Sequence, residues 1–462
     1  MLNKRLVHDV LTAALSSGGD FAEIFVENSE KNQLTMINGA VEKALWGVDY
    51  GCGIRVFSGY GAVYAYTNDT SRENLLKVAG EASQAASENK SGAIVSMDFH
   101  TVSFENIHPV LISPSAGSKK IAAEKLRIAS DASFAYNNRI SQTSGGFTGI
   151  TQDILIANSD GLWAEDRRSR TRVVMEAVAS SDIEKQTGYT APGALAGFEF
   201  LDKLNFSKMG TECAGIAITM LDAQLCPSGR MPVIIDNGFG GVIFHEACGH
   251  SLEATSVAIK SSVFSGSLGK QIASEKVTAV DDGTMPGEWG SLNIDDEGGK
   301  TQRNVLIENG VLKSFLIDRL NGLRMGMAPT GSSRRESYKY APASRMTNTF
   351  ITKGADREED IIADTEYGLY AKKMGGGSVQ PATGEFNFAV TEGYMIRSGK
   401  IAEPVRGAML IGKGSEVLLN IDRVAGNLLL AQGMCGSISG AVPTNVGQPM
   451  IRVKELTVGG RR

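Results

Sequence analysis

The chain changes character at one short segment, Cys226-Pro-Ser-Gly-Arg230, which divides its 462 residues into two halves. Before it, hydrophobic residues at helical spacing alternate with runs of alternating polarity, a pattern that predicts helices and antiparallel hairpins. After it, glycine-rich alternating runs dominate, and Asn309-Gly310 and Ser398-Gly399 read as two-residue hairpin turns. We therefore expect an α+β fold with an N-terminal helix-and-hairpin domain, residues 1–222, and a β-rich C-terminal domain, residues 228–462.

The N-terminal half repeats one order of elements. Helices followed by hairpins occur twice in it, which suggests a structural duplication, although no residue-level repeat accompanies it. The pattern predicts helices over residues 4–16, 70–87, from 117 to about 136, and 198–221. It predicts strands over residues 21–27, 33–38, 53–57, 62–67, 152–157 and 163–179.

Bulk composition disfavours several classes of protein. Lys and Arg number 46 against 51 Asp and Glu, a net charge of −5, and the densest basic cluster, Arg167–Arg172, lies in an expected strand. Direct binding to nucleic acid is therefore disfavoured. No run approaches the roughly 18 apolar residues of a membrane helix, and the amphipathic N-terminus is unlike a signal peptide. Five cysteines, odd in number and widely spaced, predict a cytoplasmic protein without a disulfide framework.

Histidine is scarce: the chain has five, and only two of them follow residue 108. These two, His245 and His250, flank Glu246 in the segment His-Glu-Ala-Cys-Gly-His. Zinc prefers imidazole, thiolate and carboxylate ligands, and a catalytic zinc keeps three protein ligands. In the related pattern H-E-x-x-H, the glutamate takes a proton from the metal-bound water. The segment therefore predicts a catalytic metal site with Glu246 as the general base.

The five-residue spacing of the two histidines poses a geometric problem. Each residue of an α-helix turns about 100°, so a regular helix would hold His245 and His250 roughly 140° apart around its axis. Gly249 directly precedes the second histidine and could ease a break or a π-bulge. We therefore expect a distorted helix here. A straight helix with the His250 ring turned away would contradict the ligand assignment.

The third metal ligand must be a thiolate or a carboxylate if it comes from the second half of the chain. Glu253 lies about one helical turn after the second histidine and could be a ligand or could orient one. Cys248 lies between the histidines, and the expected helix points it elsewhere. Cys435 lies between Gly433 and Gly436, which allow close approach of the backbone. Spacing alone favours Cys435 only slightly and leaves the alternatives open.

Segments throughout the second half resemble one family. The resemblance is to the TldD/PmbA family of metallopeptidases, specifically its TldD branch, and it covers essentially all of residues 230–460. The matching segments are residues 245–253, 262–269, 280–284, 294–298, 304–312, 334–338, 345–349, 375–377, 433–436 and 456–460. The first half resembles the family more loosely, in the order of its elements.

The resemblance implies a site and an activity. It assigns His245, His250 and Cys435 as zinc ligands, with one Zn²⁺ per active subunit, and Glu246 as the catalytic base. It implies a zinc-dependent peptidase that cuts small or unfolded peptides. It also implies a dimer, formed either by two like subunits or with a companion subunit that lacks the metal motif.

Three rival functions stay open on the sequence. The chain could be a non-catalytic, peptide-binding subunit of a peptidase complex, but the intact motif around Glu246 disfavours this. It could be a metal-dependent amidase that acts on a non-peptide substrate. It could also be a thiol enzyme that uses Cys435, but no spare histidine is available to activate the thiol.

Residues that would contact the substrate are harder to assign. Arg334, Arg335, Tyr338 and backbone N–H groups are candidates for stabilising the oxyanion, although an arginine pair can equally form surface ion pairs. Gly375-Gly376-Gly377 could let a substrate backbone lie close as an added strand, and a flexible turn is the slightly favoured alternative. Asp281-Asp282 and Asp295-Asp296-Glu297 lack a calcium-loop pattern, so we expect solvated turns or substrate-facing acids.

Overall fold

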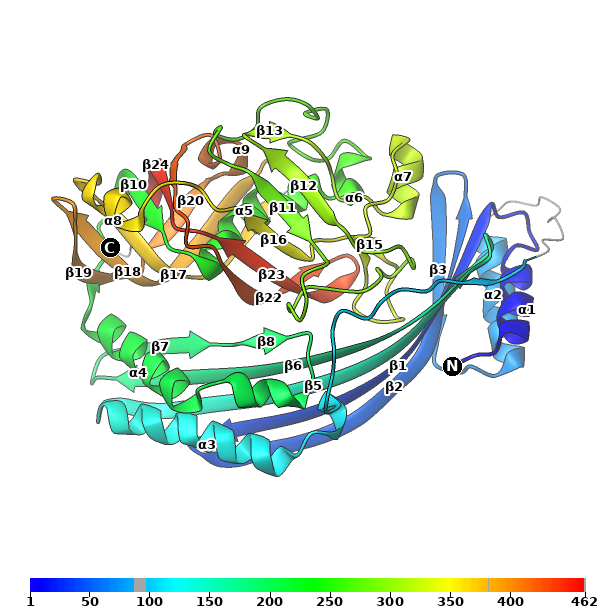
Figure 1. The fold of residues 1–462 in the computed structure, drawn as a ribbon, viewed down its shortest axis with the longest axis horizontal. Coiled ribbons are helices and arrows are strands. Elements are labelled where there is room, and N and C mark those ends of the chain that lie inside the picture. The colour runs from blue at the N-terminus through cyan, green and yellow to red at the C-terminus, as the bar shows by residue number, and fades with distance from the viewer. Residues whose placement is uncertain (87–96, 381, 461–462) are drawn as a thin grey trace.

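A computed structural model describes residues 1–86, 97–380 and 382–460 (Figure 1). A curved antiparallel sheet dominates the N-terminal half, with strands in the order β3-β2-β1-β5-β6-β4 and with β7 and β8 also paired to β6. The strands are β1 (Phe21–Ile37), β2 (Ala40–Ser58), β3 (Gly61–Thr67), β4 (His100–Thr101), β5 (Ile140–Asn158), β6 (Leu162–Ser180), β7 (Lys185–Thr190) and β8 (Gly193–Ala194).

The first strand is longer than the sequence pattern indicates. Residues 21–27 and 33–38 were expected as separate strands, but β1 runs without interruption from Phe21 to Ile37. The polar stretch between them resembles a turn in the sequence. It stays extended because β1 pairs with β2 on one side and with β5 on the other along this length. Pairing on both edges satisfies the backbone hydrogen bonds, so polar side chains there do not end the strand.

Four helices cover one face of this sheet, and the C-terminal half covers the other (Figure 1). Alternation along β1 separates the two faces: Ile24, Val26 and Leu34 pack with the helices, whereas Glu27 and Lys31 face the C-terminal half. The helices are α1 (Lys4–Ala14), α2 (Arg72–Ala86), α3 (Lys119–Tyr136) and α4 (Phe206–Asp222).

The last of these helices differs from the sequence prediction. A single helix over residues 198–221 was expected, but a 3₁₀ segment, η2 (Phe198–Lys203), precedes α4. Asn205 separates them because its side chain caps α4, accepting a hydrogen bond from the Lys208 N–H at 2.9 Å. Ser87, the expected end of the second helix, lies outside the described residues. The duplication stays a prediction.

The C-terminal half contains a closed ring of five strands and a six-stranded sheet. The ring is β17 (Tyr367–Gln380), β10 (Gly229–Ile235), β24 (Ile451–Gly459), β20 (Met409–Lys413) and β18 (Glu385–Arg397), which pairs back to β17. Strands β19 (Lys400–Arg406), β9 (Gln224–Leu225) and β21 (Ile421–Val424) extend it. The sheet is β13 (Val311–Leu312), β12 (Arg303–Glu308), β11 (Ala279–Asp282), β16 (Asn348–Ile351), β23 (Gly440–Gln448) and β22 (Leu429–Ser437).

Short elements complete this half around one large apolar core. Both expected hairpin turns are present, since Asn309-Gly310 and Ser398-Gly399 have positive φ at both positions, as a type I′ turn requires. The short elements are η3 (Gly238–Gly241), α5 (Val242–Ala247), η4 (Gly249–Leu252), α6 (Ala254–Val257), α7 (Arg319–Met325), β14 (Ser333–Arg334), β15 (Ala343–Ser344), α8 (Glu358–Ala363) and α9 (Gly414–Val417). The mixed helix-and-sheet fold is thus confirmed. No helix among the described residues has the length and apolar character needed to cross a lipid bilayer.

The acidic segments of the C-terminal half are buried, so the expectation of solvated turns is wrong. Asp296 accepts a hydrogen bond from Arg168 Nη1 at 2.6 Å, and Glu297 accepts one from Arg55 Nη2 at the same distance. Both arginines belong to the N-terminal sheet, so these ion pairs join the two halves. Asp281 accepts from Thr347 and Thr349 within the C-terminal half. Burial is tolerated because each carboxylate has donors.

Candidate metal centre

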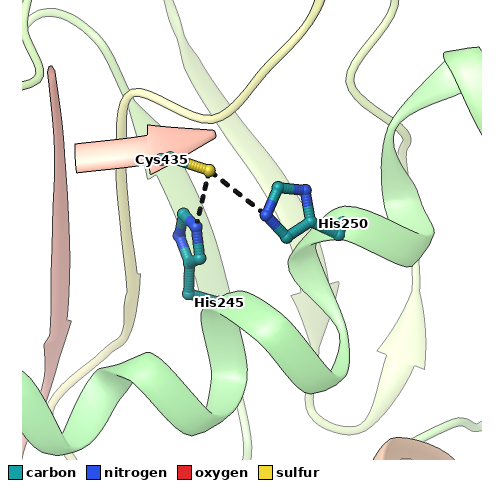
Figure 2. A group of neighbouring side chains, drawn as sticks. All are labelled: His245, His250 and Cys435. Atoms are coloured by element: carbon teal, nitrogen blue, oxygen red, sulfur yellow. Dashed lines mark hydrogen bonds between the residues drawn. The ribbon is translucent and has the colours of Figure 1, made fainter. Parts of the chain in front are cut away.

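The chain between the two histidines is not a continuous helix. Helix α5 ends at Ala247, Cys248 takes φ −127° and ψ −51°, and the 3₁₀ turn η4 begins at Gly249. This change of path offsets the 140° that a regular helix would impose on the five-residue spacing. The two imidazole rings come to lie 5.0 Å apart between centroids, at 83° to one another (Figure 2).

Glycine contacts hold α5 in place. A Cβ on Gly241 would collide with the backbone of Gly447 in β23, and a Cβ on Gly414 would collide with the carbonyl oxygen of Ala247. The helix that carries His245 is therefore fixed by direct backbone contacts at both ends. Much of the local glycine content serves this close approach.

The structure brings His245, His250 and Cys435 together (Figure 2). Cys435 lies in β22, and its Sγ is 3.1 Å from His245 Nε2 and 3.2 Å from His250 Nε2. All three ligand atoms lie within 4.8 Å of one another. Bond lengths of about 2.0 Å to nitrogen and 2.3 Å to sulfur in a tetrahedral zinc site separate nitrogen from sulfur by about 3.6 Å. The two nitrogen–sulfur distances in the structure are about half an ångström shorter than this, and two imidazoles with one thiolate form a donor set that fits zinc.

The cluster holds the Cys435 thiol in its ionised form. Burial raises the pKa of the Cys435 thiol, but the adjacent His245 and His250 rings outweigh burial and lower it to about 3. Burial lowers the pKa of His250, but the Glu253 carboxylate and Cys435 outweigh burial and raise it well above its ordinary value. A thiolate beside two imidazoles is the form of cysteine that coordinates metals.

Two buried charged residues brace the cluster. Glu253 Oε2 is 3.1 Å from His250 Nδ1, so it orients the ring and directs Nε2 towards Cys435. Arg345 is fully buried, lies 3.7 Å from Glu253 Oε1 through its Nε, and donates from Nη2 to the Cys435 carbonyl oxygen. Arg345 therefore links the segment after His250 to the strand that carries Cys435. We did not predict this role from the sequence, because nothing in the segment Arg-Met-Thr-Asn-Thr distinguishes a buried arginine from an exposed one.

Glu246 lies beside the cluster without belonging to it. Its Oε2 is 3.7 Å from His250 Nε2, and 23% of its side chain is exposed. The neighbouring ring of His250 is 11% exposed. The Glu246 carboxylate is thus near the ligand atom of His250 and remains accessible to solvent.

The alternative ligands take other places. Cys248 is fully buried in the apolar core of the C-terminal half, and its burial raises the pKa of its thiol. Glu253 contacts His250 rather than completing the cluster. Of the three candidates from spacing, only Cys435 joins the two histidines.

Three of the expected substrate residues form hydrogen bonds with partners outside the cluster. Arg335 pairs with Glu23 at 2.9 Å, Arg334 donates to the Met346 carbonyl, and Tyr338 OH donates to Asp49. All three thus form hydrogen bonds within the protein. Their roles towards a substrate stay predictions.

Gly375, Gly376 and Gly377 lie within β17, at an irregularity in its pairing with β18. The flexible turn that was slightly favoured for them is therefore wrong. A Cβ on Gly376 would meet no atom within 4 Å, whereas one on Gly377 would collide with Phe388. An approach of substrate backbone to Gly376 stays a prediction.

Family models match most of the chain. They are the PmbA/TldA metallopeptidase domain 1 over residues 22–86, the central domain over residues 117–221 and the C-terminal domain over residues 228–460. Together with the site, they place the chain in the class of metallopeptidases.

Curated relatives of the chain are also named as metalloproteases. The chain is 34% identical to a metalloprotease TldD homolog of Haemophilus influenzae, over 96% of this chain and 93% of the relative. It is 31% identical to a metalloprotease TldD homolog of Buchnera aphidicola, over 96% of this chain and 93% of the relative. It is also 31% identical to a metalloprotease of Methanocaldococcus jannaschii, over 98% and 99%. The chain therefore belongs to the TldD/PmbA family of metallopeptidases.

Solved structures share the fold. A proposed modulator of DNA gyrase from Thermotoga maritima superposes with a TM-score of 0.80 at 20% identity, covering 99% of this chain and 100% of that one. TldE from Thermococcus kodakarensis superposes with a TM-score of 0.79 at 18% identity, covering 98% and 100%. At these identities the likeness establishes the fold alone.

The contact between Glu253 and His250 leads to a prediction. Glu253→Gln should lower zinc affinity about 10- to 100-fold, because an amide orients and polarises the imidazole less well than a carboxylate. Competition against a chromophoric chelator measures this affinity. Glu416→Gln, which removes an exposed carboxylate from α9, is the matched control and should leave the affinity unchanged. An unaltered affinity in a folded Glu253→Gln protein would show that Glu253 does not orient the ligand.

Proposed function

We propose that this chain is a zinc-dependent metallopeptidase that hydrolyses peptide bonds in small or unfolded peptides. One observation carries the proposal: His245, His250 and Cys435 converge within 4.8 Å while Glu246 lies beside them, with its Oε2 3.7 Å from His250 Nε2. Two imidazoles and a thiolate are a ligand set that zinc prefers, and three protein ligands leave a position for chemistry. The metalloprotease names of the relatives support the same reading.

The residues around the site have separable tasks. A zinc ion held by the three ligands would supply the Lewis acidity that amide hydrolysis needs. Glu246 accepts a proton from the attacking water and passes it to the nitrogen of the leaving amine. Its partial exposure lets substrate and water reach it. Glu253 and Arg345 position ligands and contact no substrate.

Replacing Glu246 tests the activity directly. Glu246→Gln should retain zinc at one ion per chain and lose peptide cleavage by at least about 100-fold, because an amide cannot accept the proton. Metal analysis and cleavage of a fluorogenic peptide measure the two effects. Removing zinc from the wild type with a chelator should abolish cleavage, and adding zinc back should restore it.

Other outcomes would favour the rival functions. Full cleavage by Glu246→Gln would refute the role of this glutamate. A zinc-loaded wild type that binds peptides but cuts none would indicate a non-catalytic subunit. Cleavage confined to non-peptide amides would indicate an amidase.

We further propose that the chain works as a dimer, with a second copy or with a companion subunit. Residues 40–51 of β2 pair with β1 on one side, and no described strand pairs with their other edge. Three large apolar residues of this segment are solvent-exposed: Leu45 is 56% exposed, Trp46 60% and Val48 51%. A long apolar edge strand left uncovered is prone to aggregation, so a partner that covers it is favoured.

The edge of β2 yields a test of association. Trp46→Lys should convert a dimer of like subunits to monomers, because a charge at the edge opposes pairing. Light scattering on the purified chain measures the mass. Leu111→Lys is the control, because Leu111 is 83% exposed and lies outside β2, and it should leave the mass unchanged. A wild type that is monomeric at every concentration would contradict a dimer of like subunits.

The location in the cell is also a proposal. The cytoplasm suits a chain whose five cysteines are all free, because thiols stay reduced there.

A further inference from the structure

A cavity lies between the two halves of the chain. It has a volume of about 680 Å³ and is bounded by β1, β2, β5 and β6 of the curved sheet and by three C-terminal segments, residues 289–296, 334–340 and 434–443. The volume suits a small molecule or a short peptide. Its lining includes Arg334 and Arg335, two of the predicted substrate residues, but none of the residues assigned above to metal binding or proton transfer.

The β22–β23 ribbon separates this cavity from the metal centre. Cys435 pairs with Val442 across the ribbon, and Met434 pairs with Pro443. Because successive side chains of a strand point to opposite faces, Met434 and Pro443 lie on the face away from Cys435. Met434 and Pro443 line the cavity, whereas Cys435 contacts the histidines. The cavity therefore lies on the other face of the ribbon from the metal cluster.

Positive charge predominates in the lining. Seven lysines and arginines line the cavity against four aspartates and glutamates, although the whole chain carries a net charge of −5. Arg168 is neutralised by Asp296 at 2.6 Å, and Lys339 by Asp49 at 2.7 Å. Arg335 pairs with Glu23, which lies outside the lining. The remaining arginines lack such partners.

Three of the lining arginines, Arg170, Arg172 and Arg334, have no carboxylate oxygen within 4.0 Å among the described residues. Arg170 donates to the carbonyl oxygens of Trp289 and Ser291, both at 3.3 Å. These bonds leave other N–H groups of its guanidinium free, since arginine has five.

The other two guanidinium groups are also incompletely satisfied. Arg334 uses Nη1 for the Met346 carbonyl at 2.6 Å and for Thr444 Oγ1 at 3.4 Å. Arg172 lies over the Trp289 ring, 5.4 Å from its centroid, and its buried Nε has no hydrogen-bond partner. Burying a cation without a counter-ion is costly, so this arrangement favours an anion in the cavity.

The electrostatics agree with an uncompensated positive site. Burial and the neighbouring cations Arg334 and Arg168 together lower the pKa of Arg170 to about 9, although nearby carboxylates oppose them. Burial and the nearby Arg345 likewise lower the pKa of Arg334 to about 10, although Asp296 opposes them. An anion placed between these groups would relieve both the desolvation and the mutual repulsion.

We propose that the cavity binds a ligand carrying an oxyanion, a carboxylate or a phosphate, through Arg170, Arg172 and Arg334. Guanidinium groups match the geometry of such anions and form paired hydrogen bonds with them. The Trp289 ring beside Arg172 offers an apolar surface to the rest of the ligand. This site goes beyond the proposed peptidase function, and its test needs no turnover.

Calorimetric titration of the zinc-loaded protein with inorganic phosphate, and separately with glutarate, tests the proposal. At least one of these probes should bind saturably to the wild type, and Arg172→Gln should weaken that binding at least tenfold. Arg167→Gln is the matched control, since Arg167 is exposed on the same strand and pairs with Asp153 outside the cavity. It should bind as the wild type does. Binding at the zinc ion would be unaffected by Arg172→Gln.

A second variant tests the same site without replacing an arginine. Thr148 lies directly opposite Arg172 across β5 and β6 and lines the cavity. Thr148→Asp places a carboxylate opposite Arg172, where it competes with an anionic ligand, and should also weaken binding at least tenfold. Preference for phosphate or for glutarate identifies the source of the oxyanion. Absence of saturable binding to the wild type, or wild-type affinity in both Arg172→Gln and Thr148→Asp, would overturn the proposal.

Discussion

The interruption of helix α5 at Cys248 is the constraint on which the candidate metal centre depends. A five-residue spacing cannot place two imidazoles on one face of a regular helix, and the change to a 3₁₀ turn at Gly249 brings His245 and His250 together. The surrounding fold holds the helix before the break in place. Glycines at 241 and 414 let β23 and α9 approach the helix backbone, so its orientation is set by packing on both sides.

The three ligand atoms come from two distant parts of the chain, and buried charge joins these parts. Arg345 contacts Glu253 on one side and the backbone of Cys435 on the other, while Glu253 contacts His250. Each member neutralises or orients its neighbour, which is why such charges can be buried at acceptable cost. A second set of buried ion pairs, around Asp296 and Glu297, joins the two halves of the chain, and one of them, Arg168–Asp296, lies in the lining of the arginine-lined cavity.

The sequence predicted the parts of this structure that depend on local signals. The hairpin turns at Asn309-Gly310 and Ser398-Gly399 follow from residues that tolerate positive φ, and the need for a helix break follows from the spacing of His245 and His250 alone. The family followed from motifs spread over the second half and is established by the matches to known proteins.

Features that depend on tertiary pairing escaped the sequence. Strand β1 crosses a polar stretch because both its edges are paired, and the acids around Asp296 are buried because arginines from another part of the chain reach them. Arg345 and Arg172 look like ordinary surface residues in the sequence, because their burial depends on segments far away along the chain. Such long-range neighbours cannot be inferred from spacing.

The coordination of zinc tests the central claim most directly. X-ray absorption at the zinc edge of the purified, metal-loaded chain should show one sulfur at about 2.3 Å together with nitrogen or oxygen neighbours at about 2.0 to 2.1 Å. The sulfur contribution should disappear in Cys435→Ser, while the imidazole contribution persists. A shell of nitrogen and oxygen alone in the wild type would contradict the assignment of Cys435, and with it the three-residue centre described above.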